Sequence, residues 1–119
     1  MAKTVTSEPV TPTINIIAAG TLIEGDIRTN GDIRVDGQVK GNLTVQGRIV
    51  IGESGQVEGE IRCQNADFSG NIKGKVFVGE VLTMRSNARL TGDIQTQKIS
   101  IEPGAVFTGN CSMQQGQQE

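Results

Sequence analysis

The stretch Val57-Glu58-Gly59-Glu60-Ile61 decides the fold of this chain. It reads apolar-x-Gly-x-apolar, and the same pattern recurs along the sequence with small changes. Its copies begin at residues 23, 39, 57, 72, 90 and 107, so successive copies lie 16, 18, 15, 18 and 17 residues apart. Self-similarity at a nearly fixed period indicates a repeat architecture, in which each repeat is one structural unit stacked on the next.

A second element, apolar-x-apolar, recurs between the glycine motifs. Its copies are 14–16, 33–35, 49–51, 82–84 and 99–101, with a weak copy at 66–68. Each motif glycine precedes the next copy by 7 or 8 residues, and each copy precedes the next glycine by 8 or 10, except that the first takes 11. A change of two residues preserves side-chain alternation, so we expect one corner loop to lengthen while the strands stay in register. Residues typical of turns fill the long corners at 52–55, 85–88 and 102–105.

These repeats predict an all-β, single-domain parallel β-helix of about six rungs, each of about 17 residues and holding three short strands. Columns of Ile and Val would line its interior. The motif glycine would sit at a corner that needs a positive φ or a close backbone approach. We expect a right-handed coil, because the repeat length drifts instead of holding strict hexapeptides. An antiparallel sandwich or barrel also has many short strands, but it does not explain the repeat.

Composition excludes several functional classes. The chain has 119 residues, a net charge of −2, no Tyr and no Trp, and it shows no basic stripe, so we expect no nucleic-acid partner. It contains no apolar run of membrane-spanning length, and residues 1–13 lack the apolar core of a signal peptide, which predicts a cytoplasmic protein. Its two cysteines fit reduced thiols, and we expect Cys63 and Cys111 both to be buried small apolar groups.

The sequence lacks the residue patterns of the common catalytic and metal sites. The chain has no His and no Gly-x4-Gly-Lys-Ser/Thr phosphate loop. Asp26, Asp32 and Asp36 are candidates for a calcium or carboxylate site, but Arg28 and Arg34 are interleaved with them, which favours solvated surface charges. We therefore predict a protein that is not an enzyme, with no catalytic residue, no cofactor and no bound metal.

The ends of the predicted solenoid carry the functional hypothesis. Residues 1–13 and 114–119 are expected to be disordered tails around a β-helix at 14–113, and neither tail offers a cap for an open rung. Phe107 stands where other copies have Ile, Val or Leu, either as a core residue of a tapering end or as a contact to a neighbour. The residues predicted for the polymerisation interface are Phe107, Met113, Val106, Ile14 and Ile16. Two outward apolar residues, Phe77 and Val50, are predicted to make lateral contacts.

The repeated glycine motifs and the closing stretch Pro103-Gly104-Ala105-Val106-Phe107-Thr108-Gly109 resemble the bactofilins over residues 14–113. The resemblance implies a bacterial cytoskeletal protein with a right-handed, three-faced β-helix. It also implies non-polar filaments that form without nucleotide through head-to-head and tail-to-tail contacts, with Phe107 matching a phenylalanine important for assembly. Implied roles are a homopolymeric scaffold for cell shape or cell-wall enzymes, contact with other bactofilins, and location at the inner face of the membrane through an N-terminal tail, although here that tail is only weakly apolar.

Two hypotheses follow. The first is a self-assembling scaffold, favoured by the uncapped ends. The second is a β-helical carbohydrate-binding or enzyme-like module, which predicts a groove with clustered carboxylates, His or aromatic residues. An adhesin-like stalk is a distant third, because it needs a secretion signal.

Overall fold

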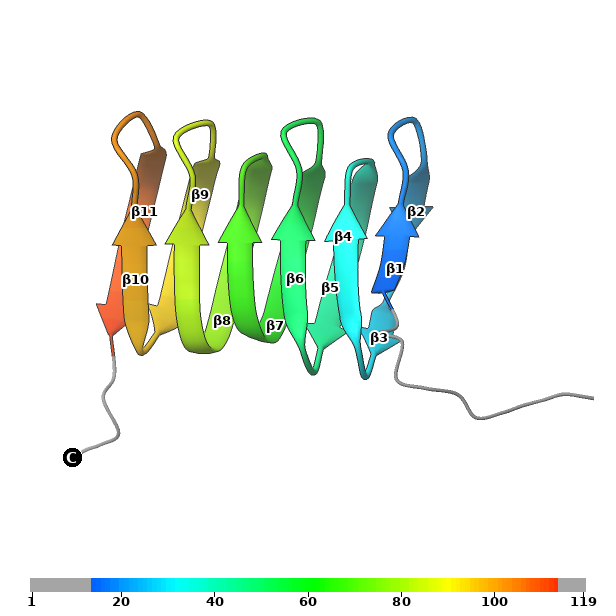
Figure 1. The fold of residues 1–119 in the computed structure, drawn as a ribbon, viewed down its shortest axis with the longest axis horizontal. Coiled ribbons are helices and arrows are strands. Elements are labelled where there is room, and N and C mark those ends of the chain that lie inside the picture. The colour runs from blue at the N-terminus through cyan, green and yellow to red at the C-terminus, as the bar shows by residue number, and fades with distance from the viewer. Residues whose placement is uncertain (1–13, 114–119) are drawn as a thin grey trace, which may run out of the picture.

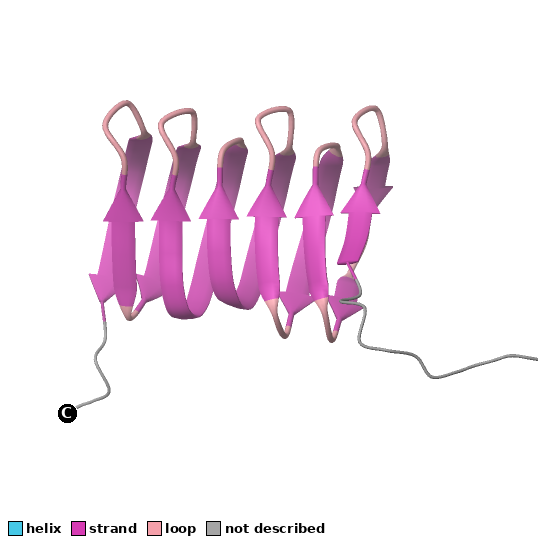
Figure 2. Cartoon of the chain, viewed as in Figure 1, coloured by secondary structure: helices cyan, strands magenta, loops and turns pink. Residues whose placement is uncertain are grey.

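A computed structural model describes residues 14–113, and this part of the chain forms eleven β-strands joined by short turns (Figures 1 and 2). The predicted tails at 1–13 and 114–119 lie outside the described residues. The strands are β1 (Ile14–Ile17), β2 (Leu22–Glu24), β3 (Ile27–Thr29), β4 (Asp32–Val35), β5 (Gln38–Val45), β6 (Arg48–Ile51), β7 (Gln56–Phe68), β8 (Asn71–Met84), β9 (Arg89–Thr96), β10 (Lys98–Ile101) and β11 (Val106–Met113). Residues 14–113 contain no helix long and apolar enough to cross a membrane.

The strands wind into a parallel β-solenoid with three faces. The first face holds the apolar-x-apolar elements, the second the strands before each motif glycine, and the third the strands after it. Strands of one rung pair in parallel with those of the next on every face, as β1 does with β4, and β7 with β8. In Figure 1 the first-face strands run upward at the front, the chain crosses over the top to the back, and it advances from right to left, so the coil is right-handed. The predicted fold class is confirmed.

Inward side chains of the three faces form one apolar core. They stack in columns because the rungs are in register, as Leu43, Ile61 and Val76 do on the third face. Phe68 is the largest side chain that is fully buried, and it lies between Ile51 and Met84 in its column. Burying one such side chain contributes about 1.5–3 kcal/mol, so the stacked columns are what stabilise the solenoid.

The motif glycines form a column at the corner between the second and third faces. Their φ angles run from 130° at Gly25 to 142° at Gly41, a region that L-residues avoid. A Cβ atom on Gly59 would overlap the carbonyl oxygen of Gly41 in the preceding rung, and the same holds for each motif glycine except Gly25, which lies in the first rung that the structure describes. Both predicted reasons for glycine, a positive φ and a close backbone approach, are therefore confirmed.

The first rung corrects one expectation. Asn15, not Ile14, pairs with Ile33, and Ile16 pairs with the outward Arg34, so the first copy of the apolar-x-apolar element is 15–17 rather than 14–16. Ile16 consequently points outward and is 62% exposed, whereas Ile17 is buried. A slip of one residue moves every side chain to the opposite face. The anomalous spacing of 11 residues was the signal, since counting from Asn15 gives 10, the value of the other long corners.

Candidate assembly surfaces

The C-terminal end of the solenoid is an open rung. Strands β10 and β11 pair with β8 and β9 on one side, and no described strand pairs with their other edge. Their inward side chains consequently lack a covering rung. Ile101 is 47% exposed although Met84, its partner in the preceding rung, is fully buried. Free strand edges beside an apolar cross-section form a template for pairing with another chain.

Cys111 departs from the prediction that both cysteines are buried. It lies in the inward column next to the buried Ile94, but it is exposed because its rung is the last one among residues 14–113. Cys63, in an interior rung, is buried as expected, and burial raises the pKa of its thiol to about 12. The difference between the two thiols reports the open end, since both point toward the solenoid axis.

The N-terminal end is open in the same way. Strands β1, β2 and β3 pair only with β4 and β5 among the described residues, so their other edges are free. Ile23 and Ile27 point inward and are half-buried, whereas their partners Val39 and Leu43 are fully buried. Both ends therefore combine unpaired backbone with partly exposed aliphatic side chains.

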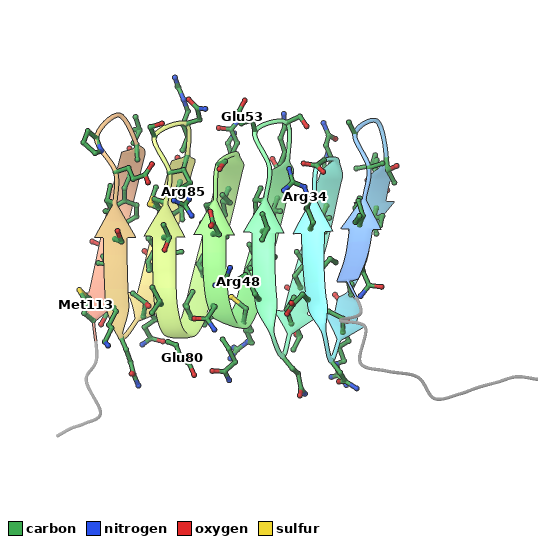
Figure 3. The ribbon with its side chains drawn as sticks, in the orientation of Figure 1. Arg34, Arg48, Glu53, Glu80, Arg85 and Met113 are labelled. Carbon is green, nitrogen blue, oxygen red and sulfur yellow. The ribbon has the colours of Figure 1, made fainter. Side chains whose placement is uncertain are left out.

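The five residues predicted for the polymerisation interface occupy different positions. Phe107 points inward, is half-buried and packs against the core, and Met113 ends the last strand, 49% exposed (Figure 3). Val106 and Ile16 point sideways from the end rungs, on the second and first faces. The backbone of Ile14 begins β1 opposite Asp32. Ile101 and Cys111 also point inward in the last rung and were not among the predicted interface residues, although side-chain alternation within that rung identifies both.

Phe77 and Val50, predicted to make lateral contacts, point outward as expected and are half-buried. The guanidinium of Arg62 lies over the Phe77 ring, 4.5 Å from its centroid, and Val50 sits in register between Arg34 and Asp67. Phe77 and Arg62 line a shallow hollow of about 720 Å³ on the third face. Charged neighbours thus cover part of both apolar side chains.

Two arginines at the first face, Arg34 and Arg85, form ion pairs with nearby carboxylates. Arg85 bridges two rungs, contacting Asp67 at 2.7 Å and Glu102 at 3.2 Å, and these bonds raise the pKa of its guanidinium (Figure 3). Arg34 contacts Asp36 at 2.9 Å. Water screens such exposed ion pairs, so they add little to the stability of the fold.

The three aspartates considered as a calcium site are held apart by separate partners. Asp26 accepts a hydrogen bond from the Asn42 amide at 3.1 Å, and Asp32 accepts one from the backbone N–H of Arg48 at 2.9 Å. Asp36 belongs to the ion pair with Arg34. Within residues 14–113 no group of three or more Cys, Asp and Glu residues is placed to hold a metal ion.

A right-handed parallel solenoid with an apolar core that is open at both ends defines a class of structural repeat protein. The profile described as "Bactofilin: Polymer-forming cytoskeletal" matches residues 15–112, so the chain belongs to the bactofilin family of cytoskeletal proteins. It is 29% identical to bactofilin BacO of Myxococcus xanthus (strain DK1622) over 98 residues, which are 82% of this chain and 78% of that protein. It is 30% identical to bactofilin BacP of the same strain over 65 residues, 55% of this chain and 27% of BacP.

The fold also matches a solved structure. The cytoskeletal bactofilin BacA, determined by solid-state NMR, superposes with a TM-score of 0.64 at 30% sequence identity, over 86% of this chain and 97% of that one. The resemblance drawn from the glycine repeats is therefore confirmed at the level of family and fold.

Proposed function

We propose that this protein is a cytoskeletal scaffold, without enzymatic activity, whose subunits join end to end into filaments. The observation that carries the proposal is the state of the two end rungs. Each presents free parallel-strand edges around half-exposed apolar side chains, Ile23 and Ile27 at one end and Ile101 and Phe107 at the other. Stacking another rung on either end would satisfy the backbone and cover these side chains.

The joints of such a filament are head-to-head and tail-to-tail. Like ends then meet about two-fold axes, and the filament has no polarity. At the tail joint the inward residues Phe107, Cys111 and Met113 of two subunits would cover one another. Burial of apolar surface and strand pairing supply the driving force, so we expect assembly without nucleotide.

The cellular role we propose is to organise cell shape or cell-wall machinery from the cytoplasm, with cell-wall enzymes or other bactofilins as partners. A short N-terminal segment would bring the filament to the inner face of the membrane. The support for these roles is membership of a family of cytoskeletal proteins.

Negative-stain electron microscopy of the purified protein, with and without ATP or GTP, tests the assembly. We expect filaments in both conditions. Phe107→Arg would place a charge inside the tail joint, so this variant is expected to give soluble monomers and head-to-head dimers with an unchanged far-UV CD spectrum. Ser112→Arg is the matched control, because Ser112 is an exposed, outward residue of the same strand.

Filaments of normal length from Phe107→Arg would overturn the tail joint. Uniform wild-type monomers in both conditions would overturn end-to-end assembly altogether. A requirement for ATP or GTP would contradict the proposed driving force.

A further inference from the structure

The second face differs from the other two in being fully open. Its outward residues form two columns in register along the solenoid, and every one of them is exposed. On the first and third faces, by contrast, outward residues such as Val50, Asp67 and Phe77 are half-buried by their neighbours. Both columns point outward. The column farther from the motif glycines, called the outer column, is Leu22, Gln38, Gln56, Asn71, Arg89 and Val106. The column next to the motif glycines, called the inner column, is Glu24, Lys40, Glu58, Lys73, Thr91 and Thr108.

The inner column alternates in charge over four successive rungs, from Glu24 to Lys73. Among residues 14–113 the ion pairs involve Arg34, Arg62 and Arg85, on the first and third faces, and none of these four side chains. The outer column is polar in its four middle positions, whereas its two end positions are the exposed apolar residues Leu22 and Val106. The face thus carries unpaired charges at its centre and an apolar residue at each end.

We propose that two filaments pair laterally through this second face, with neighbouring subunits antiparallel and related by a two-fold axis that runs along the strands. The proposal rests on the proposed end-to-end assembly. Such an axis sets each column against the same column of the other copy in reverse order. Glu58 then faces Lys73 of the second copy and Lys73 faces its Glu58, while Leu22 and Val106 meet at both ends.

Two alternative alignments bring like charges together or bring no opposite charges together. In an antiparallel pair shifted by one rung, Glu58 would face Glu58 in one direction and Lys73 would face Lys73 in the other. In a parallel pair the two columns exchange, so Leu22 would face the carboxylate of Glu24 and no opposite charges would meet. Like charges opposite one another are destabilising, so the alternation of sign selects the antiparallel direction and excludes a shift of one rung. A shift of two rungs would set Glu24 against Lys73 and Lys40 against Glu58, but Leu22 would then face Asn71 instead of Val106. The apolar residues at the two ends of the face therefore select the unshifted register.

The size of the face sets where this pairing can occur. Three residues along six rungs cover roughly 300 Å² per subunit, using about 3.3 Å per residue and about 4.8 Å per rung. A stable pair of proteins usually buries about 800 Å² on each partner. Single subunits are therefore expected not to pair, whereas many subunits held along one filament would pair by multivalency.

Mixing two charge-reversal variants tests the proposal. Filaments of Glu58→Lys and of Lys73→Glu are grown separately at low salt and viewed alone and after mixing. In each variant alone, positions 58 and 73 carry the same sign, so we expect filaments of normal length that lie singly. In the mixture two lysines face two glutamates, and lateral pairs should return. Repulsion within one chain persists on mixing, so only contact between chains explains the rescue.

Glu80→Lys and Lys98→Glu provide the matched control, since both positions are exposed and lie on other parts of the surface. Each control variant is expected to pair alone as the wild type does, and high salt should separate wild-type pairs into single filaments. Wild-type filaments that lie singly at low salt, variants that still pair alone, or a mixture that stays unpaired would each overturn the proposal. Absence of any filament would instead refute the end-to-end assembly.

Discussion

The corner glycines offer the sharpest test of how the rungs stack. Gly59 has a φ of 133°, and a Cβ atom there would overlap the carbonyl oxygen of Gly41. Gly59→Ala therefore imposes two separate costs, a backbone conformation that alanine avoids and a collision with the preceding rung. Gly25→Ala imposes only the first, because Gly25 has nearly the same φ of 130° and no atom within 4 Å of its Cβ position.

The expected magnitudes separate the two variants. A residue forced into a sparsely populated backbone region costs about 1–3 kcal/mol. Alanine recovers about 0.4–1 kcal/mol of that by restricting the unfolded chain. Gly25→Ala should therefore lose about 1–2 kcal/mol. The collision at Gly59 forces the rungs apart, which by analogy with an overpacked core adds about 1–3 kcal/mol.

The position of a residue along the solenoid needs its own control, since an end rung opens more readily than an interior one. Gly109 supplies it. It lies in the last rung, has a φ of 139°, and its Cβ would overlap the carbonyl oxygen of Gly92. Gly109→Ala and Gly25→Ala thus compare two end rungs that differ in the collision.

Thermal and urea unfolding followed by far-UV CD measure these losses. The measurements use the Phe107→Arg background at concentrations where size-exclusion chromatography shows monomers, because a head-to-head joint would set a second copy against the rung of Gly25. One kcal/mol corresponds to about 4–8 °C in Tm for a domain of this size. We expect the order Gly25→Ala, Gly109→Ala, Gly59→Ala in increasing loss. Equal losses at all three positions would refute the argument that rungs approach one another most closely along the glycine column.

Two further predictions concern the first rung and the cysteines. Ile16→Ser is expected to change the free energy of unfolding by no more than about 0.5 kcal/mol, whereas Ile17→Ser should lower it by about 2 kcal/mol. Urea unfolding measures both changes. A larger loss in Ile16→Ser than in Ile17→Ser would show that the first repeat copy is 14–16 after all. Cys111 should react with a maleimide in the free subunit and be protected in filaments, while Cys63 reacts only after unfolding. In the native state the pKa of the Cys63 thiol is raised from 9.0 to about 12, so between these pH values the unfolded chain binds fewer protons than the folded one. The free energy of unfolding should therefore fall as pH rises through this range. In Cys63→Val it should fall less steeply.

Much of the fold could be predicted from local pattern. A glycine flanked by apolar residues recurring about every 17 residues indicates a stacked coil, because each repeat buries its apolar side chains only against its neighbours. Alternation then assigned Val76 and Val78 to the core and Phe77 to the surface, as observed. The need for glycine at each corner also follows from the repeat, since one residue type persists where every other position varies.

The sequence by itself determined the repeat, the inward columns of the interior rungs and the family. The tertiary structure decided the rest, because burial and pairing depend on which rung lies alongside. Ile16 was predicted to point inward and Asn15 outward, but the structure has the opposite. Side-chain alternation alone cannot distinguish two registers that differ by one residue, so the pairing with β4 decides between them. Cys111 is exposed although Cys63 is buried, because only the latter has a rung on both sides. The complementary charge columns of the second face likewise arise only when residues 15 to 18 apart are brought into register.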